Sequence, residues 1–139
     1  MIVCWRKDSN IVSMGDEKID STHFVKIVSE SFRTLIVHHR PSKTNGITKF
    51  SSRLRAVLDC FDPNIVTGDF NTELTKSNMV TKLFATKNFV RLTGEYTTRS
   101  FTCIDGVIAK DSKVSGYVLE SVFSFHRPIL ASYKLTDCQ

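Results

Sequence analysis

The sequence contains no long uncharged apolar run, so it predicts no membrane-spanning helix. It also lacks internal repeats and low-complexity tracts, which argues against a repeat architecture or a linker-rich chain. Residues 1–6 are apolar at only a few positions and do not have the form of a signal peptide. These absences leave one domain over residues 1–139, or part of a larger one.

Cysteine is sparse and scattered. No two cysteines share a CxxC or CxxH spacing, which argues against a zinc site. Their number is even, but disulfide frameworks usually mark shorter and denser chains. We therefore expect buried or half-buried thiols in a reducing compartment, and hence an intracellular protein of the cytoplasm or nucleus. The cysteines are Cys4, Cys60, Cys103 and Cys138.

The composition that is present favours a globular, basic protein. Hydrophobic residues make up 41% of the chain and include ten phenylalanines, enough to form a core. The formal net charge is +5, and such a surface attracts phosphates and nucleic acid over a long range. A positive net charge can equally serve to keep the protein soluble, so the prediction of a nucleic-acid partner needs further support.

The N-terminal part of the chain alternates apolar and polar residues with the period of a strand. This pattern predicts strands over residues 2–5, 11–14, 23–29 and 32–39, with a hairpin between the first two and a polar turn over 15–18.

Further along the chain, helical and strand patterns alternate. Apolar residues recur at helical spacing over residues 48–61, where Thr48 or Ser51 could cap the helix and Pro63 would end it. A second helix is predicted over residues 74–87. Further strands are predicted over residues 65–67, 88–92, 101–109, 114–120 and 129–135. Strands on both sides of a helix-strand-helix centre predict a mixed α/β layered domain.

Polar chemistry is concentrated where the strand over residues 65–67 ends. The strand runs into Gly68, and Asp69, Phe70 and Asn71 follow at once. The carboxyl end of a buried strand is where functional groups gather in layered α/β folds. We expect Asp69 and Asn71 to face the same way, with Phe70 pointing into the core.

Two more residues invite attention further along the chain. Asp105 lies in an otherwise apolar stretch, where a carboxylate is costly unless it is paired. It could simply cap a turn at Gly106 or accept backbone hydrogen bonds, and His126 alone could be a packed or surface histidine. Together they suggest more, because an aspartate beside a histidine fixes its tautomer and stabilises its charged form.

Four motifs in this order resemble the endonuclease/exonuclease/phosphatase superfamily. They are residues 68–71 (Gly-Asp-Phe-Asn), 97–99 (Thr-Thr-Arg), 104–105 (Ile-Asp) and 124–129 (Ser-Phe-His-Arg-Pro-Ile). The resemblance is greatest to the endonuclease domains of LINE-type retrotransposons, which are related to abasic-site endonucleases and DNase I. Residues 35–42 also resemble the strand that ends in a tyrosine-arginine-proline turn in this family.

The resemblance implies a role for each matching residue. Asp69 would orient the attacking water and bind the metal, and Asn71 would donate a hydrogen bond to the scissile phosphate. Asp105 would pair with His126, which would stabilise charge on that phosphate. The implied reaction is Mg²⁺-dependent hydrolysis of phosphodiester bonds in DNA. The implied fold is α/β (α+β), the C-terminal portion of a DNase I-like two-sheet β-sandwich with outer helices.

The sequence also departs from the family pattern. Nothing before Ile27 offers the expected asparagine and metal-binding glutamate, because Glu17 and Glu30 lie in turn-like contexts. Phe125 replaces the aspartate of a serine-aspartate-histidine triplet, and His39 replaces a tyrosine. Asp69 is the metal ligand that remains, so we expect weak Mg²⁺ binding and weak or lost activity.

Two further expectations concern partners. Arg40, Arg99 and Arg127 lie in loops and become candidate phosphate contacts, which would position DNA without reading its sequence. A partial fold should leave a sheet face exposed, which predicts a homodimer, a docked partner or a separate N-terminal segment. The alternatives to a nuclease are a non-catalytic pseudoenzyme that binds nucleic acid or a protein, and a phosphatase of small phosphoesters.

Overall fold

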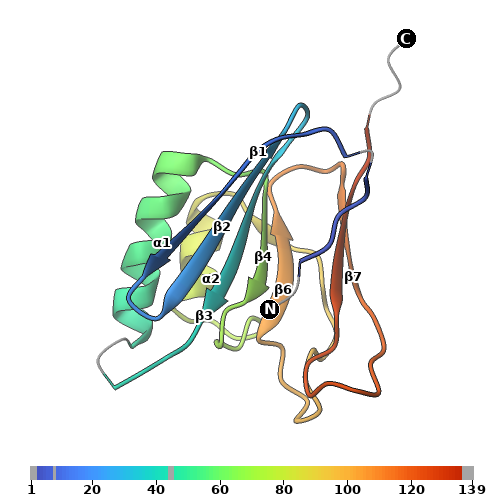
Figure 1. Cartoon of the computed structure of the whole chain (residues 1–139). Coiled ribbons are helices and arrows are strands. Elements are labelled where there is room, and N and C mark those ends of the chain that lie inside the picture. Colours follow the sequence, from blue (N-terminus) through green and yellow to red (C-terminus); the bar gives the residue numbers. More distant parts are fainter. Residues whose placement is uncertain (1–2, 8, 44–45, 136–139) are drawn as a thin grey trace.

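A six-stranded sheet forms the centre of the computed structural model, which describes residues 3–7, 9–43 and 46–135 (Figure 1). Its strand order is β1-β2-β3-β4-β6-β5, with β3 parallel to β4 and every other neighbouring pair antiparallel. The strands are β1 (Ile11–Ile19), β2 (Thr22–Ser29), β3 (Arg33–His39), β4 (Ile65–Asp69), β5 (Val90–Arg91) and β6 (Asp105–Ala109). A second sheet pairs β7 (Val114–Val118) with β8 (Ile129–Tyr133).

Two helices, α1 (Ile47–Phe61) and α2 (Met79–Thr86), cover one face of the large sheet (Figure 1). The predicted apolar stripe of α1 is buried and packs against the sheet, as the helical spacing indicated. The core on this face also contains Leu35 and Val37 from β3 and Val66 from β4. The mixed α+β fold class predicted from the sequence is therefore confirmed.

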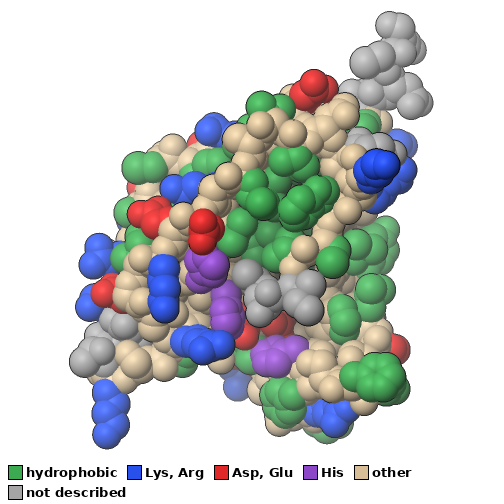
Figure 2. All heavy atoms as spheres, viewed as in Figure 1, with side chains coloured by type: hydrophobic (Ala, Val, Ile, Leu, Met, Phe, Trp, Pro, Cys, Tyr) green, Lys and Arg blue, Asp and Glu red, His purple; other side chains and the backbone are tan. Residues whose placement is uncertain are grey.

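The opposite face of the large sheet carries the smaller sheet. Ile65, Val107 and Ala109 form a second core with Val114 of β7, and Ile129 of β8 packs against it. This small sheet covers the β4–β6 side of the face. Figure 2 shows hydrophobic side chains gathered on this face between β1 and β7.

A pocket of about 440 Å³ opens on the β1–β3 side of this face. Its lining is partly apolar and partly basic or acidic. The lining residues are Val3, Met14, Gly15, Asp16, His23, Val25, His38 and Arg40.

Several N-terminal predictions are wrong. Val3–Trp5 do not form a strand, and Ile2 lies outside the described residues. Residues 11–14 instead begin β1, which pairs with β2. The polar turn expected over residues 15–18 is the continuation of β1, where cross-strand pairing outweighs the local turn preference. Glu17, for example, lies opposite Phe24 in the pairing register and forms an ion pair with Lys26.

Helix boundaries also differ from the predictions. Helix α1 has Gly46 at its N-cap and no capping side chain, so neither Thr48 nor Ser51 caps it. The helix predicted over residues 74–87 is shorter in the structure. The Asn78 side chain accepts hydrogen bonds from the backbone N–H groups of Val80 and Thr81, so α2 starts after Asn78. Strand ends differ by a few residues, and β5 keeps only two of the five predicted residues.

Cys103 is buried as expected, but Cys4 and Cys60 are exposed, so the prediction of buried or half-buried thiols fails for these two. Cys60 lies on the outward side of α1, and Cys4 lies in the segment before β1. These three cysteines are free thiols. No helix among the described residues is both long and apolar enough to cross a bilayer.

A glycine in β4 allows the central strands to approach each other. Gly68 is the register partner of Val37 on β3, and a Cβ added to it would lie 1.9 Å from the Val37 carbonyl oxygen. Its φ of +135° is also a conformation that L side chains rarely adopt. The sequence motif therefore needs glycine here because a side chain would separate the strand that carries Asp69 from its neighbour.

We expect Gly68→Ala to lower the free energy of unfolding by more than about 1 kcal/mol, because steric overlap adds to the backbone strain. Urea denaturation measures this change. Gly15→Ala is the matched control, since its Cβ would meet nothing within 4 Å. Equal stability of the two variants would contradict the close approach of β3 and β4.

Candidate functional site

Polar side chains form one row across the face of the large sheet that carries the small sheet. His23, His38, Asp69 and Asp105 are successive register partners on β2, β3, β4 and β6. Register partners point to the same face of a sheet, and their side chains lie within contact range of the next strand. Figure 2 shows histidine side chains gathered on this face, beside acidic and basic ones.

Asp69 is the last residue of β4, and the chain turns sharply after it. The backbone N–H of Asn71 donates to Asp69 Oδ1 at 2.9 Å, and Asn71 has a φ of +47°, a conformation that asparagine tolerates. Phe70 between them is fully buried, as predicted. The Asn71 side-chain Nδ2 donates to the carbonyl oxygen of His39 at 2.6 Å, which anchors the loop to β3.

Asp105 begins β6 rather than lying at the centre of its strand. It is 7% exposed, and the hydroxyl oxygen of Thr97 accepts its backbone N–H at 3.1 Å. Burial raises the pKa of the Asp105 carboxyl, and the nearby charge of Asp69 acts in the same direction. The hydrogen bond with His126 opposes these effects by favouring the charged form.

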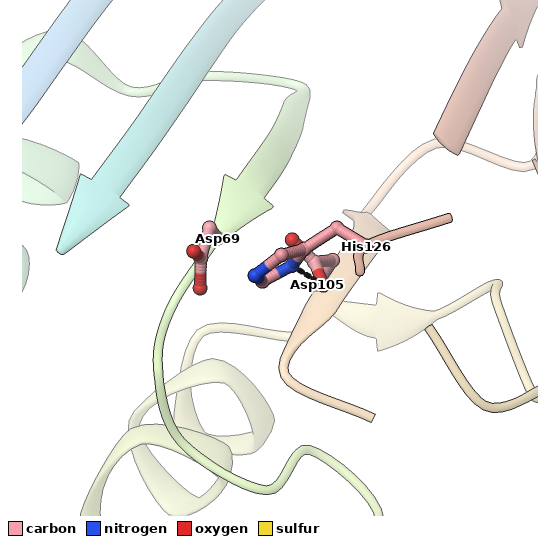
Figure 3. Close-up of side chains that lie close together, drawn as sticks. All are labelled: Asp69, Asp105 and His126. Atoms are coloured by element: carbon pink, nitrogen blue, oxygen red, sulfur yellow. Dashed lines mark hydrogen bonds and ion pairs between the residues drawn. The ribbon is translucent and has the colours of Figure 1, made fainter. Parts of the chain in front are cut away.

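His126 reaches this carboxylate from the loop between β7 and β8. Its Nδ1 lies 2.8 Å from Asp105 Oδ2, a distance at which the carboxylate accepts a hydrogen bond from Nδ1–H in the tautomer that leaves Nε2 unprotonated (Figure 3). In Figure 3 the imidazole points toward both Asp69 and Asp105. Backbone pairing of His126 with Thr98 fixes the loop that carries it.

The three side chains meet closely enough to share a ligand. One ligand atom from each of Asp69, Asp105 and His126 lies within 4.8 Å of the other two. Among the described residues, no other group of three or more histidine, cysteine, aspartate or glutamate side chains has a spacing that could bind a metal ion. The structure therefore brings together Asp69, Asp105 and His126, with Asn71 next to Asp69 in the chain.

The three candidate phosphate-binding arginines occupy different environments. Arg40 lines the pocket that also contains His23 and His38. Arg99 donates to the Val122 carbonyl oxygen at 2.9 Å. Arg127 lies 3.6 Å from Glu120 and 3.9 Å from Glu95. Arg99 and Arg127 thus help to hold the loops around His126 together, and a role in phosphate binding stays a prediction.

His38 was missed by the sequence reasoning, which singled out His39. The His39 ring is 2% exposed, stacks on Phe50 of α1 at 3.9 Å, and shares a 2.8 Å hydrogen bond with Thr22. His38 is instead the register partner of Asp69, so its side chain lies on the same face of the sheet as that of Asp69. Burial lowers the pKa of His38, whereas the charge of Asp69 raises it. The signal that identifies His38 is strand register, which the sequence does not reveal.

Phe125 occupies the position where the sequence motif suggested an aspartate. Its ring is half exposed, and its centroid lies 5.6 Å from that of the His126 ring. The residue is therefore next to the site without contributing a metal-binding atom.

The arrangement of strands and helices is shared with several solved structures. The endonuclease domain of TRAS1, a telomere-specific non-LTR retrotransposon, superposes with a TM-score of 0.69 over 93% of this chain, at 15% identity. An endonuclease/exonuclease/phosphatase family protein from Leptotrichia buccalis gives a TM-score of 0.60 over 90% of this chain, at 13% identity. The chain has the endonuclease/exonuclease/phosphatase fold.

The same fold is found in the cytolethal distending toxin of Haemophilus ducreyi, with a TM-score of 0.60 over 90% of this chain and 19% identity. The chain spans 70% of the TRAS1 endonuclease domain, 62% of the Leptotrichia protein and 57% of the toxin chain. No family model and no curated protein sequence matches this chain. The fold predicted from the four motifs is thus confirmed by structural similarity.

Proposed function

We propose that this chain hydrolyses phosphodiester bonds in DNA at the cluster of Asp69, Asp105 and His126, at a low rate. The observation that carries the proposal is the 2.8 Å hydrogen bond between Asp105 and His126. A second carboxylate, that of Asp69, has an oxygen within 4.8 Å of both side chains. Three of the motif residues named from the sequence, Asp69, Asp105 and His126, lie together, and Asn71 follows Asp69 at the end of the same strand. The fold is one that an endonuclease domain also has.

The Asp105–His126 pair supplies charge stabilisation. Asp105 accepts a hydrogen bond from Nδ1–H and so holds the imidazole in the tautomer with an unprotonated Nε2. A proton taken up at Nε2 gives an imidazolium that Asp105 stabilises. Such a cation beside the scissile phosphate offsets the negative charge that develops as water attacks.

Asp69 and Asn71 complete the phosphate-facing side. Asp69 ends its strand with a carboxylate that can accept a proton from the attacking water and orient it. The side-chain amide of Asn71 uses one N–H to hold the His39 carbonyl, and its second N–H remains for a phosphate oxygen.

A divalent cation suits this site in part. Asp69 and Asp105 are direct register partners, and like charges that face each other across strands repel. A cation bound by Asp69, with Asp105 close by, would relieve this repulsion and neutralise charge on the phosphate. Mg²⁺ prefers oxygen ligands, and His126 already occupies one oxygen of Asp105, so we expect weak binding.

DNA is the substrate that the charge and the comparisons favour. The net charge of +5 supports attraction of a polyanion, and Arg40 lies in a pocket beside His38, the neighbour of Asp69. The TRAS1 structure is an endonuclease domain of a retrotransposon, which is consistent with a DNA substrate for this fold.

A second candidate function is a non-catalytic protein that retains the site for binding nucleic acid or a protein partner. The observation that favours it is Phe125, a half-exposed aromatic residue next to His126 where the motif suggested a carboxylate. The two functions differ in whether the site binds a metal ion and hydrolyses DNA.

The proposal predicts slow nicking of supercoiled DNA in the presence of Mg²⁺ or Mn²⁺. Asp69→Ala and His126→Ala should each lower the rate by about 100-fold or more, because each removes a group that acts on the phosphate or water. Asp59→Ala is the matched control, since Asp59 pairs with Lys87 between the helices. Nicking that persists unchanged in Asp69→Ala would refute the proposed site, and no nicking by the unaltered chain would leave the non-catalytic function.

Phe125→Asp tests the metal site directly. The added carboxylate should tighten Mg²⁺ binding by about tenfold, the equivalent of one charge-assisted contact. Calorimetric titration of each protein with MgCl₂ measures the change. Phe123→Asp is the control, because it adds the same charge two residues away on a 97% exposed side chain. Absence of Mg²⁺ binding even in Phe125→Asp would refute a metal site at the three clustered side chains, and equal affinities of the two variants would show that residue 125 does not reach that site.

A further inference from the structure

We propose that the loops around His126 form a stacking platform for unpaired bases, so that the site takes single-stranded or locally unpaired DNA. The inference deepens the proposed function and rests on it for the identity of the neighbouring phosphate site. The aromatic platform consists of Tyr96, Phe101, Phe123 and Phe125.

The four aromatic side chains of the platform are open to solvent. Phe123 is 97% exposed, Phe101 is 72% exposed, and Tyr96 and Phe125 are 55% and 50% exposed. Val122, whose carbonyl oxygen accepts a hydrogen bond from Arg99, is 75% exposed. Single exposed apolar residues are ordinary, but several exposed aromatic rings on two joined loops point to an interaction site.

The platform is held in place rather than left as loose loops. The backbone N–H of Arg99 donates to the Phe125 carbonyl oxygen at 3.0 Å, and that of Arg127 donates to the Thr97 carbonyl oxygen at 2.7 Å. The Arg99 side chain also donates to the Val122 carbonyl oxygen. These bonds join the loop before β6 to the loop before β8, so the aromatic rings are presented by one body. A preformed surface loses less entropy when a ligand binds.

Phe101 adopts a conformation that bulky residues avoid. Its φ is +60°, which costs a non-glycine residue about 1–2 kcal/mol. A turn in which the Phe101 N–H donates to the Thr98 carbonyl oxygen holds it there. The ring gains no burial from this strain, and it meets Tyr96 edge to face with centroids 5.5 Å apart. The strained backbone therefore presents an aromatic pair to solvent.

The platform is continuous with the catalytic site. Phe125 directly precedes His126, and their ring centroids are 5.6 Å apart. On the other loop, Thr98 pairs with His126, and Thr97 accepts the backbone N–H of Asp105. A DNA strand whose phosphate contacts His126 therefore has its next bases beside the platform. Figure 2 shows hydrophobic and basic side chains together at the lower end of this face, below a histidine.

Unpaired bases are the occupant that these features favour over another protein. Aromatic rings bind base faces in a sequence-tolerant way, and basic side chains in the same loops attract the phosphates between them. Arg99 supplies such a charge beside Val122, whereas the charge of Arg127 is partly offset by Glu120 at 3.6 Å and Glu95 at 3.9 Å. In a duplex the base faces are stacked on each other, so the rings can reach them only where the strand is single or locally unpaired.

Fluorescence anisotropy with labelled oligo-dT and with a duplex of equal length tests the platform, in EDTA so that no hydrolysis occurs. Phe123→Ala should weaken binding of the single strand by about 5- to 100-fold and affect the duplex much less. Phe123→Trp should restore single-strand binding. Tyr117→Ala is the matched control, because Tyr117 is an aromatic residue on β7 that is 51% exposed and outside the platform.

Equal single-strand affinities for Phe123→Ala and Tyr117→Ala would overturn the inference, as would equal losses for the single strand and the duplex. Light scattering of the same proteins provides a further check. A dimer that Phe123→Ala converts into a monomer, with single-strand affinity unchanged, would assign the platform to a protein contact and overturn base stacking. Nicking that is absent while the Phe123 effect persists would refute the proposed hydrolysis alone.

Discussion

Two carboxylates on one rung of a sheet are the constraint around which this molecule is arranged. Asp69 and Asp105 are register partners on the neighbouring strands β4 and β6, and Asp105 is buried. Such a pair is unfavourable unless positive charge lies between the two groups. His126 supplies a hydrogen bond to one of them, and a cation or an imidazolium would complete the compensation. A sheet built for stability alone would place apolar residues on this rung.

The neighbouring structure serves this pair. Gly68 lets β3 and β4 approach, which sets Asp69 level with His38, and Thr97 fixes the start of β6 at Asp105. The pairing of Thr98 with His126 then brings in a residue from a distant loop. The same loop contacts that deliver the histidine also present exposed aromatic rings. The geometry of the cluster and the presentation of the exposed rings thus depend on one set of backbone hydrogen bonds.

Much of the fold and the cluster could be predicted, because ordered motifs and helical periodicity are local signals. Helix α1 and the strand before Asp69 follow from such signals, whereas the pairing of Asp105 with His126 is implied by the resemblance of the ordered motifs to a known family. Strand β1 could not be predicted, because it is an exposed edge whose polar middle resembles a turn. The choice between His38 and His39 depends on register, since a shift of one residue reverses the face. The exposed rings depend on how two loops meet, which no local pattern records.

The most direct test of the account is the tautomer of His126, measured by ¹⁵N–¹H NMR of the imidazole nitrogens at a pH where the ring is neutral. We expect a protonated Nδ1 and an unprotonated Nε2, because Asp105 Oδ2 accepts a hydrogen bond from Nδ1–H at 2.8 Å. Asp105→Asn should change this tautomer balance, whereas Asp111→Asn should leave it unaltered, because the Asp111 carboxylate accepts a hydrogen bond from Tyr133 instead. A neutral ring protonated at Nε2, indifferent to Asp105→Asn, would contradict the pairing on which the site is built.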